Sequence, residues 1–143
     1  MVDKINLNIS SNKEEVAEYM SVIRLTTSAV SSKVGFDIEE IDDIKVAIGE
    51  ACNNIIKHGL VDGKGCFNIE YSIYEDRLTI SLKDDGCGFD TSDIKEPKIV
   101  QNVDKIDESG LGIFIIKSLM DEVVINSDKE HGTEIIMTKI KIA

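Results

Sequence analysis

The 143-residue sequence has no tryptophan, one proline and no apolar run near the roughly 20 residues that a membrane-spanning helix needs. The scarcity of proline and the absence of low-complexity stretches argue against a linker or a disordered tail. Basic residues are also few, with 16 lysines and arginines against 27 acidic residues and a net charge of −11. Such a surface repels a phosphate backbone, so we expect no direct nucleic-acid binding and no membrane contact. A basic protein partner fits better.

Cysteine is scarce as well. The three cysteines, Cys52, Cys66 and Cys87, are odd in number, and none stands in the CxxC spacing of a zinc or redox motif. The first residues, MVDKINLNIS, lack the apolar core of a secretory signal. We therefore expect a cytoplasmic protein with structural cysteines. A chain of this length has enough residues for one hydrophobic core, which predicts a single domain over residues 1–143.

Hydrophobic periodicity predicts the order of the secondary structure. Alternating apolar and polar residues indicate strands, whereas apolar residues three and four apart indicate helices. The predicted strands cover residues 5–9, 66–73, 77–83, 123–127 and 133–142, and the predicted helices cover 12–33, 37–59 and the stretch from 110. Hairpins with segregated helices predict an α+β fold. We expect a two-layer α/β sandwich whose mixed, mostly antiparallel sheet carries the helices on one face.

The predicted second helix has the clearest local signals. Gly35 ends the preceding helix, and Asp37 followed by Glu40 resembles a capping box at the start of the next one. The apolar stripe of this helix, which we expect to face the core, consists of Ile38, Ile41, Ile44, Ile48, Cys52 and Ile55.

Polar residues interrupt this helix in the stretch EACNNIIKHG. Glu50 and Asn54 are four residues apart, so they lie side by side on one helical face, and Ala47 and His58 extend the same line. A carboxylate and an amide placed together could converge on one ligand. The alternative is a solvated polar stripe on an amphipathic helix.

Two further motifs stand at the ends of predicted strands. In KDDGCGFD, Asp84 directly follows a strand, and Gly86 and Gly88 allow a ligand to approach the backbone closely. A carboxylate in this position could accept a hydrogen bond from an exocyclic amine such as that of adenine, although a glycine-rich turn explains the same residues. In HGTE, Thr133 enters the last strand, and an ordinary hairpin turn is the alternative there.

A long segment without regular periodicity, residues 86–109, contains Pro97, the only proline. Loops of this length in a compact domain usually serve binding, so we interpret the segment as a lid. The motif SGLGI then places Gly110, Leu111 and Gly112 at the beginning of a helix, where free backbone N–H groups and the positive end of the dipole favour phosphate. The alternative is a loop-to-helix junction in which glycine allows close packing.

Neither the P-loop nor the signature of eukaryotic protein kinases occurs in the sequence. The four motifs instead resemble, in order and spacing, the nucleotide-binding boxes of the ATPase superfamily that includes gyrase and the histidine kinases. More closely, VAIGEACNNIIKHG, DDGCGFD, SGLGIFIIKSLMDEV and HGTEI are similar to the bacterial anti-sigma factor serine kinases. The resemblance extends over residues 5–142.

This resemblance implies a role for each motif. Glu50 corresponds to the general base of the family, Asn54 to the residue that holds Mg²⁺, and Asp84 to the carboxylate that binds the adenine amine of ATP. The remaining residues that the resemblance assigns to the nucleotide pocket are Gly86, Gly88, Gly110, Leu111, Gly112 and Thr133.

The resemblance also implies partners. Members of the family sequester an RNA polymerase sigma factor and phosphorylate a serine on an anti-anti-sigma antagonist, and they form homodimers. The apolar positions Val16, Tyr19, Met20 and Ile23 of the first helix belong either to such a dimer interface or to the core.

One departure from the family keeps other functions open. Relatives often carry an arginine in the last residues of the lid, whereas KIDESG has Asp107 and Glu108 there, with Lys105 as the nearest basic residue. This motivates a nucleotide-gated protein-binding module without kinase activity as an alternative. A detached histidine-kinase-type catalytic domain is a second alternative, because it would share the same motifs.

Overall fold

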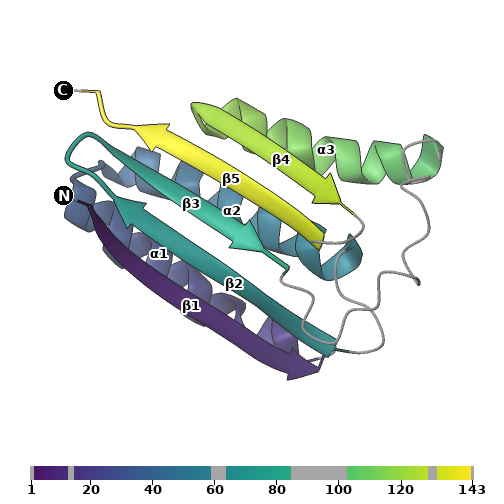
Figure 1. Cartoon of the computed structure of the whole chain (residues 1–143). Helices are drawn as coiled ribbons and strands as arrows, with labels where there is room; N and C mark the ends of the chain where they lie inside the picture. Colours follow the sequence, from purple (N-terminus) through teal and green to yellow (C-terminus); the bar gives the residue numbers. More distant parts are fainter. Residues whose placement is uncertain (1, 13–14, 59–63, 85–102, 129–131, 143) are drawn as a thin grey trace.

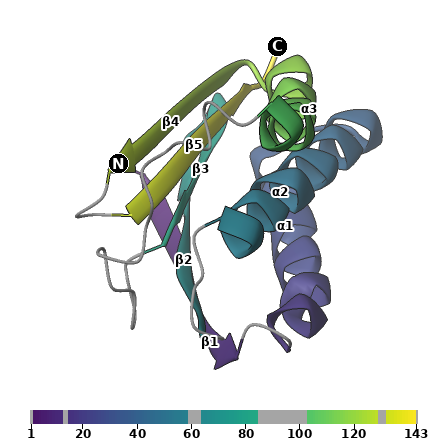
Figure 2. The same ribbon diagram turned by 90° about the vertical axis from the view of Figure 1, so that its right-hand side faces the viewer.

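All helices cover one face of a five-stranded antiparallel sheet in this computed structural model (Figure 1). The structure describes residues 2–12, 15–58, 64–84, 103–128 and 132–142. The strands are β1 (Asp3–Asn12), β2 (Lys64–Ile73), β3 (Arg77–Lys83), β4 (Glu122–Asp128) and β5 (Gly132–Ile140). The helices are the short 3-10 helix η1 (Val16–Tyr19), α1 (Met20–Val34), α2 (Ile38–His58) and α3 (Val103–Leu119). Figure 2 shows the two layers edge on, which confirms the predicted α+β sandwich.

The sheet has the order β1-β2-β3-β5-β4, and every pair of neighbours is antiparallel. Side chains alternate between its two faces. On β3, Leu78, Ile80 and Leu82 are fully buried under the helices. On the opposite face, the hydroxyl of Thr79 lies 3.1 Å from that of Thr138 on β5. One face is therefore apolar and covered, and the other is polar.

The local signals at the junction of α1 and α2 are confirmed. Gly35 has a left-handed φ of 105°, and its N–H bonds the carbonyl of Ser32 at 3.0 Å, while the N–H of Phe36 bonds that of Ser31 at 3.3 Å. These two bonds form a Schellman motif, in which glycine is favoured because the conformation strains other residues. The capping box then starts α2, because Asp37 and Glu40 exchange side-chain to backbone hydrogen bonds of 2.8 and 2.9 Å.

The predicted stripe of α2 is mostly correct. Ile44, Ile48, Cys52 and Ile55 are fully buried, whereas Ile38 is 79% exposed, so its assignment to the core is wrong. Ile38 is the first residue of α2, and packing against the core begins one turn later with Ile41.

Two helices begin at other places than predicted. The first helix was expected over residues 12–33, but α1 begins at Met20 after the short helix η1. The third helix was expected from Gly110, but α3 already begins at Val103. Its first residues include Asp104 and Asp107, and acidic residues near a helix start complement its dipole. The rest of the predicted lid, residues 86–102, lies outside the described residues.

The sequence left open whether four apolar residues of the first helix belong to the core or to a dimer interface. Three of them are buried in the core of one chain: Val16, Met20 and Ile23. Tyr19 is 45% exposed and stays available to a partner.

Two of the cysteines lie in described parts of the chain. Cys52 is free and fully buried, and desolvation raises the pKa of its thiol to about 12. The Cys52 side chain is therefore protonated and unreactive at neutral pH, which agrees with a structural role. Cys66 is disulfide-bonded, which the odd cysteine count did not predict.

Within the described residues, no helix has both the length and the apolar character needed to cross a bilayer.

Candidate active site

The carboxylate of Glu50 lies where α2 packs against α3. Ala47 and Ala51, which lie beside Glu50 and Asn54 on the same side of α2, are fully buried, and Glu50 and Asn54 are partly buried. A Cβ atom placed on Gly112 of α3 would lie only 3.1 Å from Oε1 of Glu50. The α3 backbone can pass this close to the carboxylate because position 112 has no side chain.

Asp84 and Thr133 form a second pair of predicted residues. The N–H of Asp84 donates a 3.0 Å hydrogen bond to the carbonyl of Thr133, which continues the ladder between β3 and β5 beyond Lys83. By strand alternation, Asp84 shares the face of buried Leu82 and therefore points toward the helix layer. Its side chain is 1% exposed, so this carboxylate lies in the interior of the protein.

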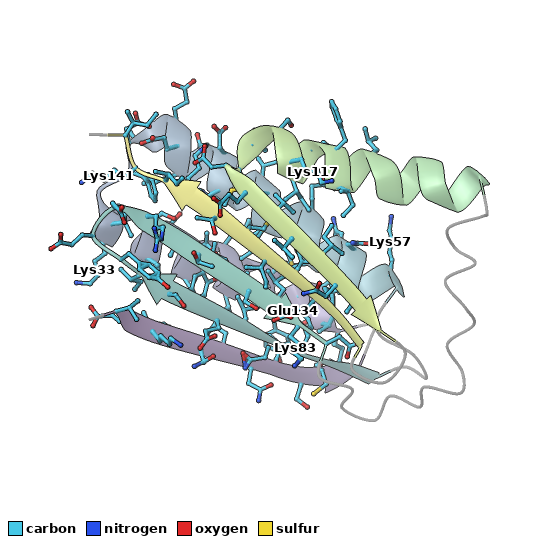
Figure 3. The ribbon with its side chains drawn as sticks, turned by 45° about the horizontal axis from the view of Figure 1, so that its top comes forward. Lys33, Lys57, Lys83, Lys117, Glu134 and Lys141 are labelled. Atoms are coloured by element: carbon cyan, nitrogen blue, oxygen red, sulfur yellow. The ribbon has the colours of Figure 1, made fainter. Side chains whose placement is uncertain are left out.

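Both pairs belong to the same part of the molecule. The end of α2, the end of β3 and the start of β5 lie at one end of the sandwich (Figure 1). In Figure 3, Lys57 of α2, Lys83 of β3 and Glu134 of β5 mark this end, whereas Lys33 and Lys141 lie at the other. The motif residues thus form two pairs, Glu50 with Gly112 between α2 and α3, and Asp84 with Thr133 where β3 ends and β5 begins.

The predicted helix start at SGLGI is wrong in this structure. Gly110, Leu111 and Gly112 lie inside α3, so the free N–H groups of its first turn belong to residues before them. Leu111 is 61% exposed, and the contribution of Gly112 is its closeness to Glu50. Gly86 and Gly88 lie outside the described residues.

A surface groove, which the sequence did not predict, reaches Glu50 from α1. The groove has a volume of about 520 Å³ and is lined by Arg24, Asp42, Lys45, Val46, Gly49, Glu50 and Asn53. The one sequence feature that could have indicated this groove is Gly49, because a glycine in the middle of a helix leaves space where a side chain would stand. Glycine weakens a helix by roughly 1 kcal/mol relative to alanine, and a Cβ on Gly49 would meet no atom within 4 Å.

We expect Gly49→Ala to raise the free energy of unfolding by about 0.5–1 kcal/mol, because alanine loses less backbone entropy in a helix and fits here without a clash. Urea denaturation followed by circular dichroism measures the change. Gly112→Ala is the matched control, since it has the same intrinsic gain but adds a Cβ 3.1 Å from Glu50 and should stabilise less. A lower stability of Gly49→Ala than of the parent would contradict the open position of this residue.

The amide oxygen of Asn54 suits Mg²⁺, which prefers carboxylate, carbonyl and water oxygens. In the parts of the chain that the structure describes, no three histidine, cysteine, aspartate or glutamate side chains gather into a metal site. Mg²⁺ is usually bound through one or two protein oxygens together with water and substrate phosphates.

Comparisons with known proteins bear on this site. The profile of the family described as histidine kinase-like ATPase domain matches residues 14–139. The serine-protein kinase RsbW of Bacillus cereus strain G9842 is 38% identical over 141 residues, which are 96% of this chain and 84% of that protein. The serine-protein kinase RsbW of Bacillus thuringiensis subsp. konkukian strain 97-27 has the same identity and coverage. These matches span Glu50, Asp84, Gly112 and Thr133.

Proposed function

Because the chain belongs to the histidine kinase-like ATPase domain family, we propose that it is an ATP-dependent protein serine kinase. The observation that carries the proposal is the placement of Glu50, which has the α3 backbone on one side and an open groove on the other. A base that acts on a protein serine must be reachable by that serine, and a partly buried carboxylate at a groove is reachable.

In this proposal the serine hydroxyl of the partner attacks the γ-phosphorus of ATP, Glu50 accepts the hydroxyl proton, and ADP leaves. Such a transfer depends mainly on positioning and on neutralising charge. Asn54 would hold Mg²⁺, which supplies charge neutralisation at the phosphates when bound. Asp84 would accept a hydrogen bond from the adenine amine, with Thr133 beside it.

The other residues of the proposed nucleotide pocket are Gly86, Gly88, Gly110, Leu111 and Gly112, which rest on the family resemblance.

The proposed partners are a sigma factor, which the protein sequesters, and an anti-anti-sigma antagonist, which carries the acceptor serine. The relatives support the kinase part of this proposal, since their name is serine-protein kinase. The net charge of −11 agrees with a partner that offers a basic surface. We further propose that the protein acts in the cytoplasm as a homodimer.

The test is phosphoryl transfer from γ-labelled ATP to a partner protein. We would isolate the proteins retained from the native lysate, identify the antagonist among them by mass spectrometry, and incubate it with the protein, labelled ATP and Mg²⁺. The expected result is label on one serine of the antagonist. Retention of the partner without any label would favour the nucleotide-gated binding module.

A further inference from the structure

A lysine of β5 lies between the two helices that meet at Glu50. Lys139 is opposite buried Leu78 in the β3 register, so its side chain points toward the helix layer. Its Nζ donates a 2.7 Å hydrogen bond to the carbonyl of Leu119, the last residue of α3, and lies 4.0 Å from Oδ2 of Asp43 on α2. The Lys139 side chain is only 14% exposed, which reduces screening by solvent.

The end of α3 is also tied to β5 on either side of Lys139. The N–H of Asp121 bonds the carbonyl of Thr138 at 2.9 Å, and the N–H of Ile140 bonds Oδ2 of Asp121 at 2.6 Å. Three successive residues of β5 thus hold the chain where it leaves α3. Of these contacts, only that of Lys139 reaches α2 as well.

The spacing of contacts connects this lysine with the candidate active site. Asp43 and Glu50 are seven residues apart on α2, and Gly112 and Leu119 are seven residues apart on α3. Seven residues make about two helical turns, so each pair lies on one face of its helix and spans roughly 10 Å. The helices run antiparallel and pack on each other between two polar places: Lys139 with Asp43 and Leu119 at one, and Glu50 against Gly112 at the other.

We propose that Lys139 is a positioning residue, which fixes α3 along α2 so that the backbone at Gly112 meets the carboxylate of Glu50. Its ammonium group suits this place because it binds a carbonyl at the negative end of the α3 dipole and a carboxylate of α2 together. Without it, α3 loses its polar link to α2 and can shift along that helix. The catalytic consequence rests on the proposed function of Glu50.

The first experiment compares Lys139→Met with Lys141→Met. Methionine keeps most of the lysine stem and removes the charge. Lys141 is the matched control because it lies two residues further along the same chain segment but beside Gly35, away from α3. We expect kcat for serine phosphorylation to fall about 10- to 100-fold in Lys139→Met, the size of effect that a small misplacement of catalytic groups causes. Lys141→Met should keep the parent rate.

A second comparison separates positioning from a general loss of structure. If Lys139 acts through Glu50, Lys139→Met should change kcat less than about twofold in a Glu50→Gln background. The effects of substitutions at interacting residues are not additive, so removing Lys139 should matter little once Glu50 is already lost. All assays are run at a temperature where circular dichroism shows each variant folded. An equal loss of kcat in both backgrounds, or equal rates for Lys139→Met and the parent, would overturn the proposal.

Hydrogen exchange keeps the proposal testable even if the parent protein transfers no phosphate. Lys139→Met should speed amide exchange in residues 111–119 and leave β2 and β3 unchanged, whereas Lys141→Met should leave residues 111–119 at the parent rate. Unchanged exchange in residues 111–119 of Lys139→Met would overturn the role of Lys139. If the parent protein transfers no phosphate but Lys139→Met still speeds exchange in residues 111–119, only the proposed kinase activity is rejected.

Discussion

Glu50→Gln should reduce the rate of serine phosphorylation by roughly 10²–10⁴-fold, the usual contribution of a general base. Glutamine has nearly the same size as glutamate but cannot take the hydroxyl proton at neutral pH. Because Glu50 lies at the groove and against Gly112, the substitution leaves the packing of α2 on α3 in place. ATP binding should therefore change little.

The measurement is the initial rate of label transfer from γ-labelled ATP, with ATP affinity determined in parallel by calorimetry. Glu39→Gln is a suitable control, since Glu39 is an exposed carboxylate in the first turn of the same helix. It should transfer phosphate at the parent rate. Transfer by Glu50→Gln at the parent rate would remove the catalytic role of Glu50.

Asp84→Asn should weaken ATP binding about tenfold or more. A hydrogen bond to a charged acceptor contributes roughly 1.5–3 kcal/mol, and 1.4 kcal/mol corresponds to tenfold in affinity. Asp84 is 1% exposed and points toward the helix layer. Water therefore cannot easily take over the hydrogen bond that the carboxylate would accept. Asparagine keeps the shape of the side chain, which limits the structural disturbance.

Isothermal titration calorimetry with ATP and Mg²⁺ measures the effect. Asp76→Asn provides the control, because Asp76 is exposed in the turn between β2 and β3, at the other end of β3 from Asp84. Thermal melting confirms that both variants are folded. ATP affinity equal to that of the parent in Asp84→Asn would contradict the assignment of this residue to the adenine end of the pocket.

Local interactions explain which parts of the fold were predictable. The Schellman motif at Gly35 and the capping box of Asp37 and Glu40 involve residues close in sequence, so the sequence alone predicts them correctly. The strand hairpin of β2 and β3 was predicted for the same reason. The start of α3 was misplaced because glycine often marks a helix boundary, whereas here Gly110 and Gly112 lie inside a helix.

The candidate site was predictable only as separate motifs. Periodicity places Glu50 and Asn54 on one face of a helix, but only the folded chain brings Gly112 within contact of Glu50. The bond from Lys139 to Leu119 joins residues on different elements, and no spacing rule relates a lysine in a strand to the last carbonyl of a helix. The groove beside Gly49 likewise depends on how α1 packs against α2.

The strand order has a consequence for how the protein folds. The hairpins β2–β3 and β4–β5 are each local in sequence, but β3 pairs with β5, and β1 pairs with β2, only across long stretches of chain. Such distant pairings require loop closure and slow folding. Asp84 follows β3 of one hairpin, Thr133 belongs to β5 of the other, and the two residues are hydrogen-bonded where the hairpins pair. A ligand that binds both residues would therefore favour the joined hairpins over the separate ones, and the proposed pocket would form only when the two hairpins pair.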